Sequence, residues 1–260
     1  VTVRGWDLGQ EFPGRGSCVD TPDRVRCARG LATSTEEPNL FTRTLEVPAA
    51  TVVEPDLWLR VRPGPALDDV IDRTDRVVAR GDAEVVDLQG SAFAATDGDP
   101  RTSWAADERS LEPGGPRPTL TLELPSPQRV TGLDIATSLG VLPVAPRAVA
   151  VNLGNGPQVR ELSEGTTTLD LAPHVTDRIT LTVLRWDDVL DRTVLGFSKL
   201  APPGIAEVTV RGDDGPIGAQ DRIYDREATI GCDDAPVVTI DGQPYRTSVT
   251  ASVADLAAGA

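Results

Sequence analysis

The sequence has no methionine, one histidine and one lysine among its 260 residues, and only 4% of the residues are aromatic. No apolar run approaches the roughly 20 residues of a membrane-spanning helix, so we expect this chain to be soluble. Basic residues are also few, and the net charge is −15. Such a charge repels the phosphate backbone of nucleic acids and the surface of anionic membranes. These absences argue against nucleic-acid binding and membrane insertion.

Groups that could catalyse a reaction are scarce. His174, the only histidine, follows Pro173 at the start of an expected strand, where a surface position is the simplest interpretation. No serine or cysteine has a recognisable base beside it, and no glycine-rich phosphate loop leads from a strand into a helix. Carboxylates are abundant, but with 40 acids in the chain adjacent pairs are interpreted as solvated turns. We assign no catalytic residue and expect the chain itself to be non-catalytic.

Glycine and proline are plentiful, with 24 and 22 residues, which favours many short strands and turns over long helices. Apolar and polar residues alternate in short runs up to about residue 71, for example at 41–47 and 57–62, with the period of half-buried strands. The sequence therefore predicts an all-β fold with a β-sandwich module over residues 1–80. Residues 67–80 are expected to join it to the next domain, with room for a helical turn or two.

The C-terminal part, residues 204–260, contains a weak internal repeat. Its run Val-Thr-Val-Arg-Gly at 208–212 matches residues 1–5, and the segment around Cys232 is similar to the one around Cys18. Repeats of this kind indicate related structural units. Two interpretations stay open: the segment begins a further β-module, or it returns to complete a second sandwich with residues 1–80.

The chain has three cysteines. Cys18 and Cys27 lie nine positions apart around a turn-rich stretch, which predicts a local disulfide; two buried free thiols are the alternative. A disulfide would place the protein outside the cytoplasm. Cys232 is left without a partner in this count.

The most informative stretch is residues 94–104, Ala-Ala-Thr-Asp-Gly-Asp-Pro-Arg-Thr-Ser-Trp. Its Asp-Gly-Asp-Pro part predicts a tight turn, because glycine permits positive φ and proline fixes its own φ. Asp97, Asp99 and Thr102 offer oxygens that, with turn carbonyls, could bind a hard cation such as Ca²⁺. The alternative is a turn satisfied by its own hydrogen bonds. Trp104 is expected to anchor the core.

This motif resembles the A-x-D-G-x-x-x-T-x-W signature of coagulation factor 5/8 type C, or discoidin-like, domains, which include family 32 carbohydrate-binding modules. Apolar runs at 119–124, 130–135, 146–151 and 178–184 are similar to strands of that family. The resemblance covers about residues 83–201. It implies a galactose-binding-like jelly-roll β-sandwich over residues 81–203, with ligands bound by loops at one end.

The resemblance also bears on calcium. The family carries a glutamate in its last strand that helps to bind the ion where calcium is present. The corresponding stretch is taken to be residues 196–200, which contain no acid. A structural Ca²⁺ held by Asp97, Asp99 and Thr102 is therefore predicted without this glutamate, and the self-bonded turn stays its alternative.

One segment has the composition of a sugar-binding site. Sugars have apolar C–H faces and a rim of hydroxyls, so their sites combine an aromatic ring with charged side chains that hold vicinal hydroxyls. Arg185, Trp186, Asp187 and Asp188 follow a predicted strand and supply these groups. A tryptophan buried at the rim of the sandwich is the alternative for Trp186.

The whole chain, with segments such as 26–32 and 231–242, is similar to the periplasmic C-terminal part of actinobacterial (mycobacterial D-type) α-(1→3)-arabinofuranosyltransferases. This resemblance implies a carbohydrate-binding region of a membrane-anchored cell-envelope enzyme, on the periplasmic face, with an arabinan-type glycan as partner. The glycosyltransferase domain itself has no counterpart in this sequence. A protein-interaction or scaffolding module is the alternative function.

Overall fold

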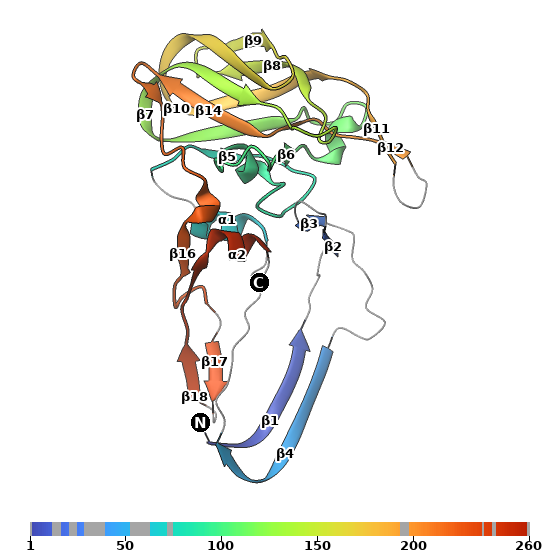
Figure 1. The fold of residues 1–260 in the computed structure, drawn as a ribbon, viewed down its shortest axis with the longest axis vertical. Helices are drawn as coiled ribbons and strands as arrows, with labels where there is room; N and C mark the ends of the chain where they lie inside the picture. Colours follow the sequence, from blue (N-terminus) through green and yellow to red (C-terminus); the bar gives the residue numbers. More distant parts are fainter. Residues whose placement is uncertain are drawn as a thin grey trace.

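The computed structural model describes residues 2–11, 17–20, 25–28, 40–52, 63–71, 75–192, 198–235, 237–240 and 243–258. Most of these residues lie in strands, which confirms the predicted all-β class. Figure 1 shows a sandwich of long strands at one end of the molecule, and short helices and separate two-stranded ladders at the other.

The sandwich is built on a seven-stranded antiparallel sheet with the order β15-β14-β7-β10-β8-β9, in which β5 also pairs with β7. Its strands are β5 (Val78–Arg80), β7 (Thr119–Ala136), β8 (Pro146–Asn152), β9 (Pro157–Glu161), β10 (Thr166–Trp186), β14 (Glu207–Gly212) and β15 (Gly215–Pro216). The runs predicted at 119–124 and 130–135 are thus two halves of one strand.

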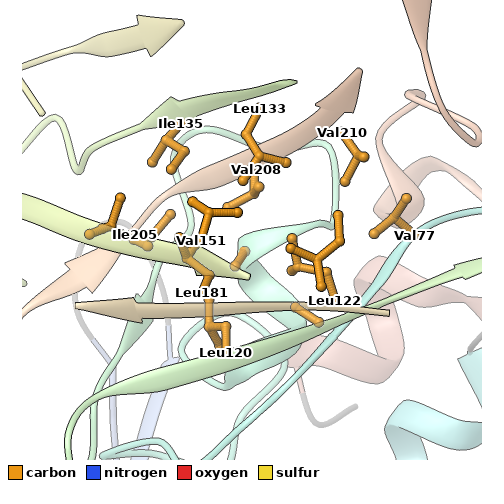
Figure 2. Close-up of a cluster of buried hydrophobic side chains, with 14 of the residues drawn as sticks. Val77, Leu120, Leu122, Leu133, Ile135, Val151, Leu181, Ile205, Val208 and Val210 are labelled. Carbon is orange, nitrogen blue, oxygen red and sulfur yellow. The ribbon is translucent and has the colours of Figure 1, made fainter. Parts of the chain in front are cut away.

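The two longest strands curve the sheet around a single core. β7 and β10 pair in two stretches, 119–123 with 178–182 and 128–136 with 166–176, with one register shift between the stretches and one within the second. Pro125 and Pro127 lie at this break in β7, where proline cannot donate a ladder hydrogen bond. Side chains from both halves, such as Leu122 and Leu133, are buried in the same cluster (Figure 2). The sheet therefore closes over its own apolar face.

Trp104 is the largest fully buried side chain of the core, with 0% of its surface exposed. It lies in β6 (Trp104–Ala105), and its indole Nε1 donates to the carbonyl of Asp82 at 2.9 Å. This satisfies the polar atom that burial would otherwise leave unpaired. The expected core role of this residue is confirmed.

The sandwich extends beyond residue 203, where the sequence places its C-terminal boundary. β13 (Gly204–Ile205) pairs with β6, and β14 pairs with β7 along its whole length. Ile205, Val208 and Val210 are buried in the main core (Figure 2). The repeat at 208–212 thus matches a strand of this sheet, because its alternate valines face the same apolar interior as β7.

The other described segments do not form the predicted second sandwich. They pair as separate ladders: β1 (Thr2–Glu11) with β4 (Leu40–Val52), β2 (Ser17–Asp20) with β3 (Val25–Ala28), β11 (Leu190–Arg192) with β12 (Ser198–Leu200), β16 (Glu227–Ile230) with β19 (Val249–Ser252), and β17 (Val237–Ile240) with β18 (Gln243–Arg246). The strand predicted at 57–62 lies outside the described residues.

A second, smaller apolar cluster explains this difference for the C-terminal ladder. Helices α1 (Pro65–Ile71) and α2 (Val253–Ala258) and the 3₁₀ turns η1 (Ala92–Ala95) and η3 (Ile223–Asp225) share it, and Ala228, Ile230 and Ala251 of the ladder pack against it. Helices, rather than an opposing sheet, therefore cover β16 and β19. A further 3₁₀ turn, η2 (Glu108–Leu111), follows β6. None of the helices in the described ranges is long and apolar enough to cross a membrane.

Candidate functional site

The Asp-Gly-Asp-Pro loop forms the predicted tight turn at the base of the sandwich. Gly98 has φ +77°, and the amide of Thr102 donates to the carbonyl of Asp99 at 3.0 Å. The amide of Gly98 donates to Glu207 Oε2 at 3.0 Å, so the loop is tied to the start of β14. A Cβ atom on Gly98 would lie 2.7 Å from the carbonyl oxygen of Asp221. The loop is therefore clamped between β14 and the segment that follows the sandwich.

Asp97 is fully buried and surrounded by neutral donors. Its Oδ1 accepts from the amide of Asp99 at 2.8 Å. Its Oδ2 accepts from the hydroxyl of Tyr224 at 2.8 Å and lies 2.7 Å from Thr102 Oγ1. Burial raises the pKa of Asp97 to about 7, although these hydrogen bonds act in the opposite direction. The buried carboxyl group thus connects the loop to Thr102 and Tyr224 through hydrogen bonds.

Asp99 has the opposite electrostatic environment. It accepts from Arg101 Nε and Nη2, both at 2.8 Å, and from Arg222 Nε at 2.7 Å. These guanidinium groups, Arg101 first, hold the pKa of Asp99 well below its usual range. Two cations already neutralise this carboxylate.

These contacts fit a calcium ion poorly. Ca²⁺ needs six to eight oxygen ligands, whereas the carboxylate oxygens of Asp97 and Asp99 are engaged by hydroxyl, amide and guanidinium donors. Among the described residues, no group of three or more His, Cys, Asp or Glu side chains could hold a metal ion. Asp97, Asp99 and Thr102 instead bond partly to one another, as in the alternative of a self-satisfied turn, and partly to Tyr224 and Arg222 from outside the turn.

The glutamate expected in the last strand is present, but at Glu207 rather than within 196–200. In the latter stretch Lys199 Nζ donates to Glu84 Oε1 at 3.0 Å, in the β11–β12 ladder outside the main sheet. Glu207 opens β14 and contacts the loop. Burial, followed by the charge of Asp97, raises the pKa of Glu207 to about 9. It therefore carries a proton at neutral pH and can donate a hydrogen bond.

A pocket of about 270 Å³ opens beside this loop. Six segments line it: the residues before β5, the loop itself, the end of β7, the start of β10, β14, and residues 219–220. Its polar side chains are Arg76, Thr96, Asp134, Thr166, Glu207, Thr209 and Gln220, and its apolar ones are Val77, Pro100, Ala136, Val208, Val210 and Ala219. Hydrogen-bonding groups of both kinds thus converge over an apolar floor, a combination typical of small-molecule sites. The sequence reasoning did not identify this pocket, because its residues are far apart in the chain.

The predicted site at 185–188 lies at the other end of β10 from Thr166. Arg185 pairs with Glu161, and Asp187 accepts from Arg147 Nε at 2.9 Å. The partly buried ring of Trp186 packs against the main core, as in the rim role that was its alternative. Asp188 is exposed. The polar groups are therefore close together, but they engage neighbouring charges.

The cysteines and His174 are the remaining candidates. β2 and β3 pair with Cys18 opposite Cys27 in backbone register, and the disulfide itself stays a prediction. Cys232 is a free, exposed thiol. His174 is exposed on β10, opposite Val130.

The curved antiparallel sandwich, closed by an Asp-Gly turn that ends on a buried tryptophan, has the architecture that the motif at 94–104 predicts for a carbohydrate-binding module. The family described as "Arabinofuranosyltransferase D, third carbohydrate binding module" matches residues 74–222, and the chain belongs to this family. The matched range begins before β5 and ends after β15, in agreement with the extent of the sandwich.

Relatives extend the similarity over the whole chain. It is 48% identical over 99% of its length to an α-(1→3)-arabinofuranosyltransferase of Mycobacterium tuberculosis, and 45% identical over 99% to one of Mycolicibacterium smegmatis. It is similar to a cryo-EM structure of arabinofuranosyltransferase AftD from mycobacteria, with 43% identity, a TM-score of 0.83, and coverage of 98% of this chain and 20% of that one. The chain spans 19% and 18% of the two curated relatives, about a fifth of their length.

Proposed function

We propose that this chain is a non-catalytic region that binds an arabinan- or arabinogalactan-type glycan for a membrane-anchored, cell-envelope arabinofuranosyltransferase, on the periplasmic face. The family description and the names of the relatives support the carbohydrate and the enzyme. The observation that carries the proposal is the pocket beside β14, where side chains from six segments converge.

The chemistry of the pocket suits a furanose ring. Its hydroxyls need both donors and acceptors, which Thr209, Gln220 and Asp134 supply. Pro100, Ala136 and Ala219 offer an apolar surface for C–H groups. A volume of about 270 Å³ lies just below the range of roughly 300–1,000 Å³ for drug-sized ligands, so we expect one or two sugar rings to enter.

The end of the sandwich at 185–188 is the second candidate site. Its ion pairs are exposed, with side chains of Arg185 and Asp187 that are 63% and 58% accessible. Exposed pairs of this kind contribute only about 0–1 kcal/mol, so sugar hydroxyls could replace them at little cost. This end therefore serves as the comparison in the binding experiment.

Calorimetric titration of the chain with arabinogalactan oligosaccharides tests both sites. The double variant Thr209→Val and Gln220→Ala removes two exposed or half-exposed pocket groups, and we expect about tenfold weaker binding. The variant Trp186→Ala is expected to bind within about twofold of the original chain. If Trp186→Ala weakened binding and the double variant did not, the binding site would lie at the 185–188 end of β10. No binding to any envelope glycan by a folded chain would contradict the proposal.

A protein-interaction role is the second candidate function, and one observation favours it. Leu139 and Val141 are 81% and 77% exposed in the loop after β7, and such apolar tips often contact other proteins. Loss of association with the parent enzyme in Leu139→Ser, with unchanged glycan binding, would support this role.

A further inference from the structure

We infer that guanidinium groups of this chain, Arg76 above all, hold the 96–99 loop in the place of a bound divalent cation. The inference concerns how the loop is neutralised and does not depend on which glycan binds. It rests on the contacts of one buried arginine with two segments that are far apart in the sequence.

Arg76 binds carbonyl oxygens that converge on its side chain. Only 3% of its surface is exposed. Its Nη2 donates to the carbonyl of Thr96 at 3.0 Å, and its Nη1 donates to the carbonyl of Asp221 at 3.1 Å. Backbone carbonyls of tight loops are ligands that hard cations also use. A planar guanidinium supplies fixed donors to both oxygens, which a point-like ammonium cannot match.

The charges around Arg76 give a second reason. Asp221 is the carboxylate that acts most strongly on the Arg76 guanidinium, against the opposing charge of Arg226, so Arg76 places a positive charge beside the acidic loop. Arg222 and Arg101 complete the neutralisation at Asp99. A divalent cation placed here would meet fixed positive charges and would have to break hydrogen bonds that already exist.

The arrangement also joins the flanking segments to the sandwich. Arg76 precedes β5 and reaches residue 221, while Tyr224 and Arg222 reach back to Asp97 and Asp99. The amide of Ile223 donates to the carbonyl of Asp97 at 2.9 Å. The chain thus supplies its own cations from both sides of the loop, and its fold should not depend on metal.

The first test is thermal unfolding of the whole chain in EDTA and in about 5 mM CaCl2. A calcium site of about 0.1 mM affinity would raise the midpoint by about 5 °C. We expect a difference below about 1 °C, within the error of the measurement. Tb³⁺ provides a second probe, because bound Tb³⁺ would be excited by Trp104 or Tyr224; we expect no saturable luminescence. A clear calcium-dependent rise, or saturable Tb³⁺ binding below about 1 mM, would overturn the inference.

The second test is Arg76→Met, which keeps much of the side-chain volume and removes the donors. We expect the midpoint to fall by about 5 °C or more, since two buried carbonyls lose their partner. Arg178→Met is the control, because Arg178 is 66% exposed and pairs only at the surface with Glu123; we expect a change below about 2 °C. Equal effects of the two variants would show that Arg76 is not what holds the loop. If Arg76→Met does not fold, the metal titrations of the unchanged chain still decide the question.

Discussion

At the scale of single residues, the clearest prediction is the loss of stability on substitution of Gly98. This glycine combines a φ of +77° with a Cβ position 2.7 Å from the carbonyl oxygen of Asp221. Gly98→Ala therefore adds backbone strain and a clash with a backbone atom that cannot rotate away. We expect a loss of about 3 kcal/mol in the free energy of unfolding, measured by urea denaturation.

Gly114 is a matched control for this substitution. Its φ is +79°, and an added Cβ would meet nothing within 4 Å. Gly114→Ala should cost only the strain of the left-handed backbone, about 1–2 kcal/mol. If the two variants lost the same stability, the close approach of the loop to Asp221 would carry no energy.

Residues that act through local patterns were predictable. The Asp-Gly turn and the burial of Trp104 follow from a short motif, and the structure has both. The hydrogen bonding of Asp97 is completed by Tyr224, which lies 127 positions away. The role of Arg76 likewise depends on Asp221. Such contacts arise from the packing of distant segments, and no local spacing signals them.

At the scale of elements, the strands were recognisable, but their partners were not. Alternation predicts runs such as 130–135 and 178–184, since each places apolar side chains on one face. The prediction that residues 208–212 belong to a separate module was wrong. Their sequence matches residues 1–5, but it fits the last strand of the sandwich equally well. Only its pairing with β7 decides between these, and pairing is a long-range property. For the same reason, the glutamate of the last strand was not assigned to Glu207, the first residue of β14.

The position of β14 predicts how fragments behave. A fragment of residues 81–203 lacks β5, β13 and β14, and with them the buried Ile205, Val208 and Val210. Each such side chain stabilises the fold by about 1.5–3 kcal/mol, and the total is comparable with the 5–15 kcal/mol stability of an ordinary domain. Removing β14 also exposes the edge of β7 to aggregation.

We therefore expect no cooperative thermal transition for the 81–203 fragment. A fragment of residues 63–258 keeps both apolar clusters and should unfold cooperatively in the same calorimeter. Cooperative unfolding of the shorter fragment would mean that the first boundary is the true limit of the sandwich.

At the scale of the whole molecule, charge selects the class of ligand. The chain carries 40 acidic and 25 basic residues, and many of the arginines in the described part are paired with acids, as Arg147 is with Asp187 and Arg211 with Asp170. The surface therefore repels polyanions without offering a basic stripe of its own. A neutral polysaccharide avoids this repulsion, because its hydroxyls bind through hydrogen bonds rather than through net charge.

Salt dependence tests this reasoning directly. A neutral arabinogalactan fragment releases no counterions on binding, so its affinity should change by less than about twofold between 50 and 500 mM NaCl. The measurement is the same calorimetric titration at several salt concentrations. A steep loss of affinity with salt would indicate a cationic ligand held by the excess of carboxylates. A gain in affinity would indicate an anionic ligand whose repulsion salt screens, and either result would contradict a neutral glycan as the partner.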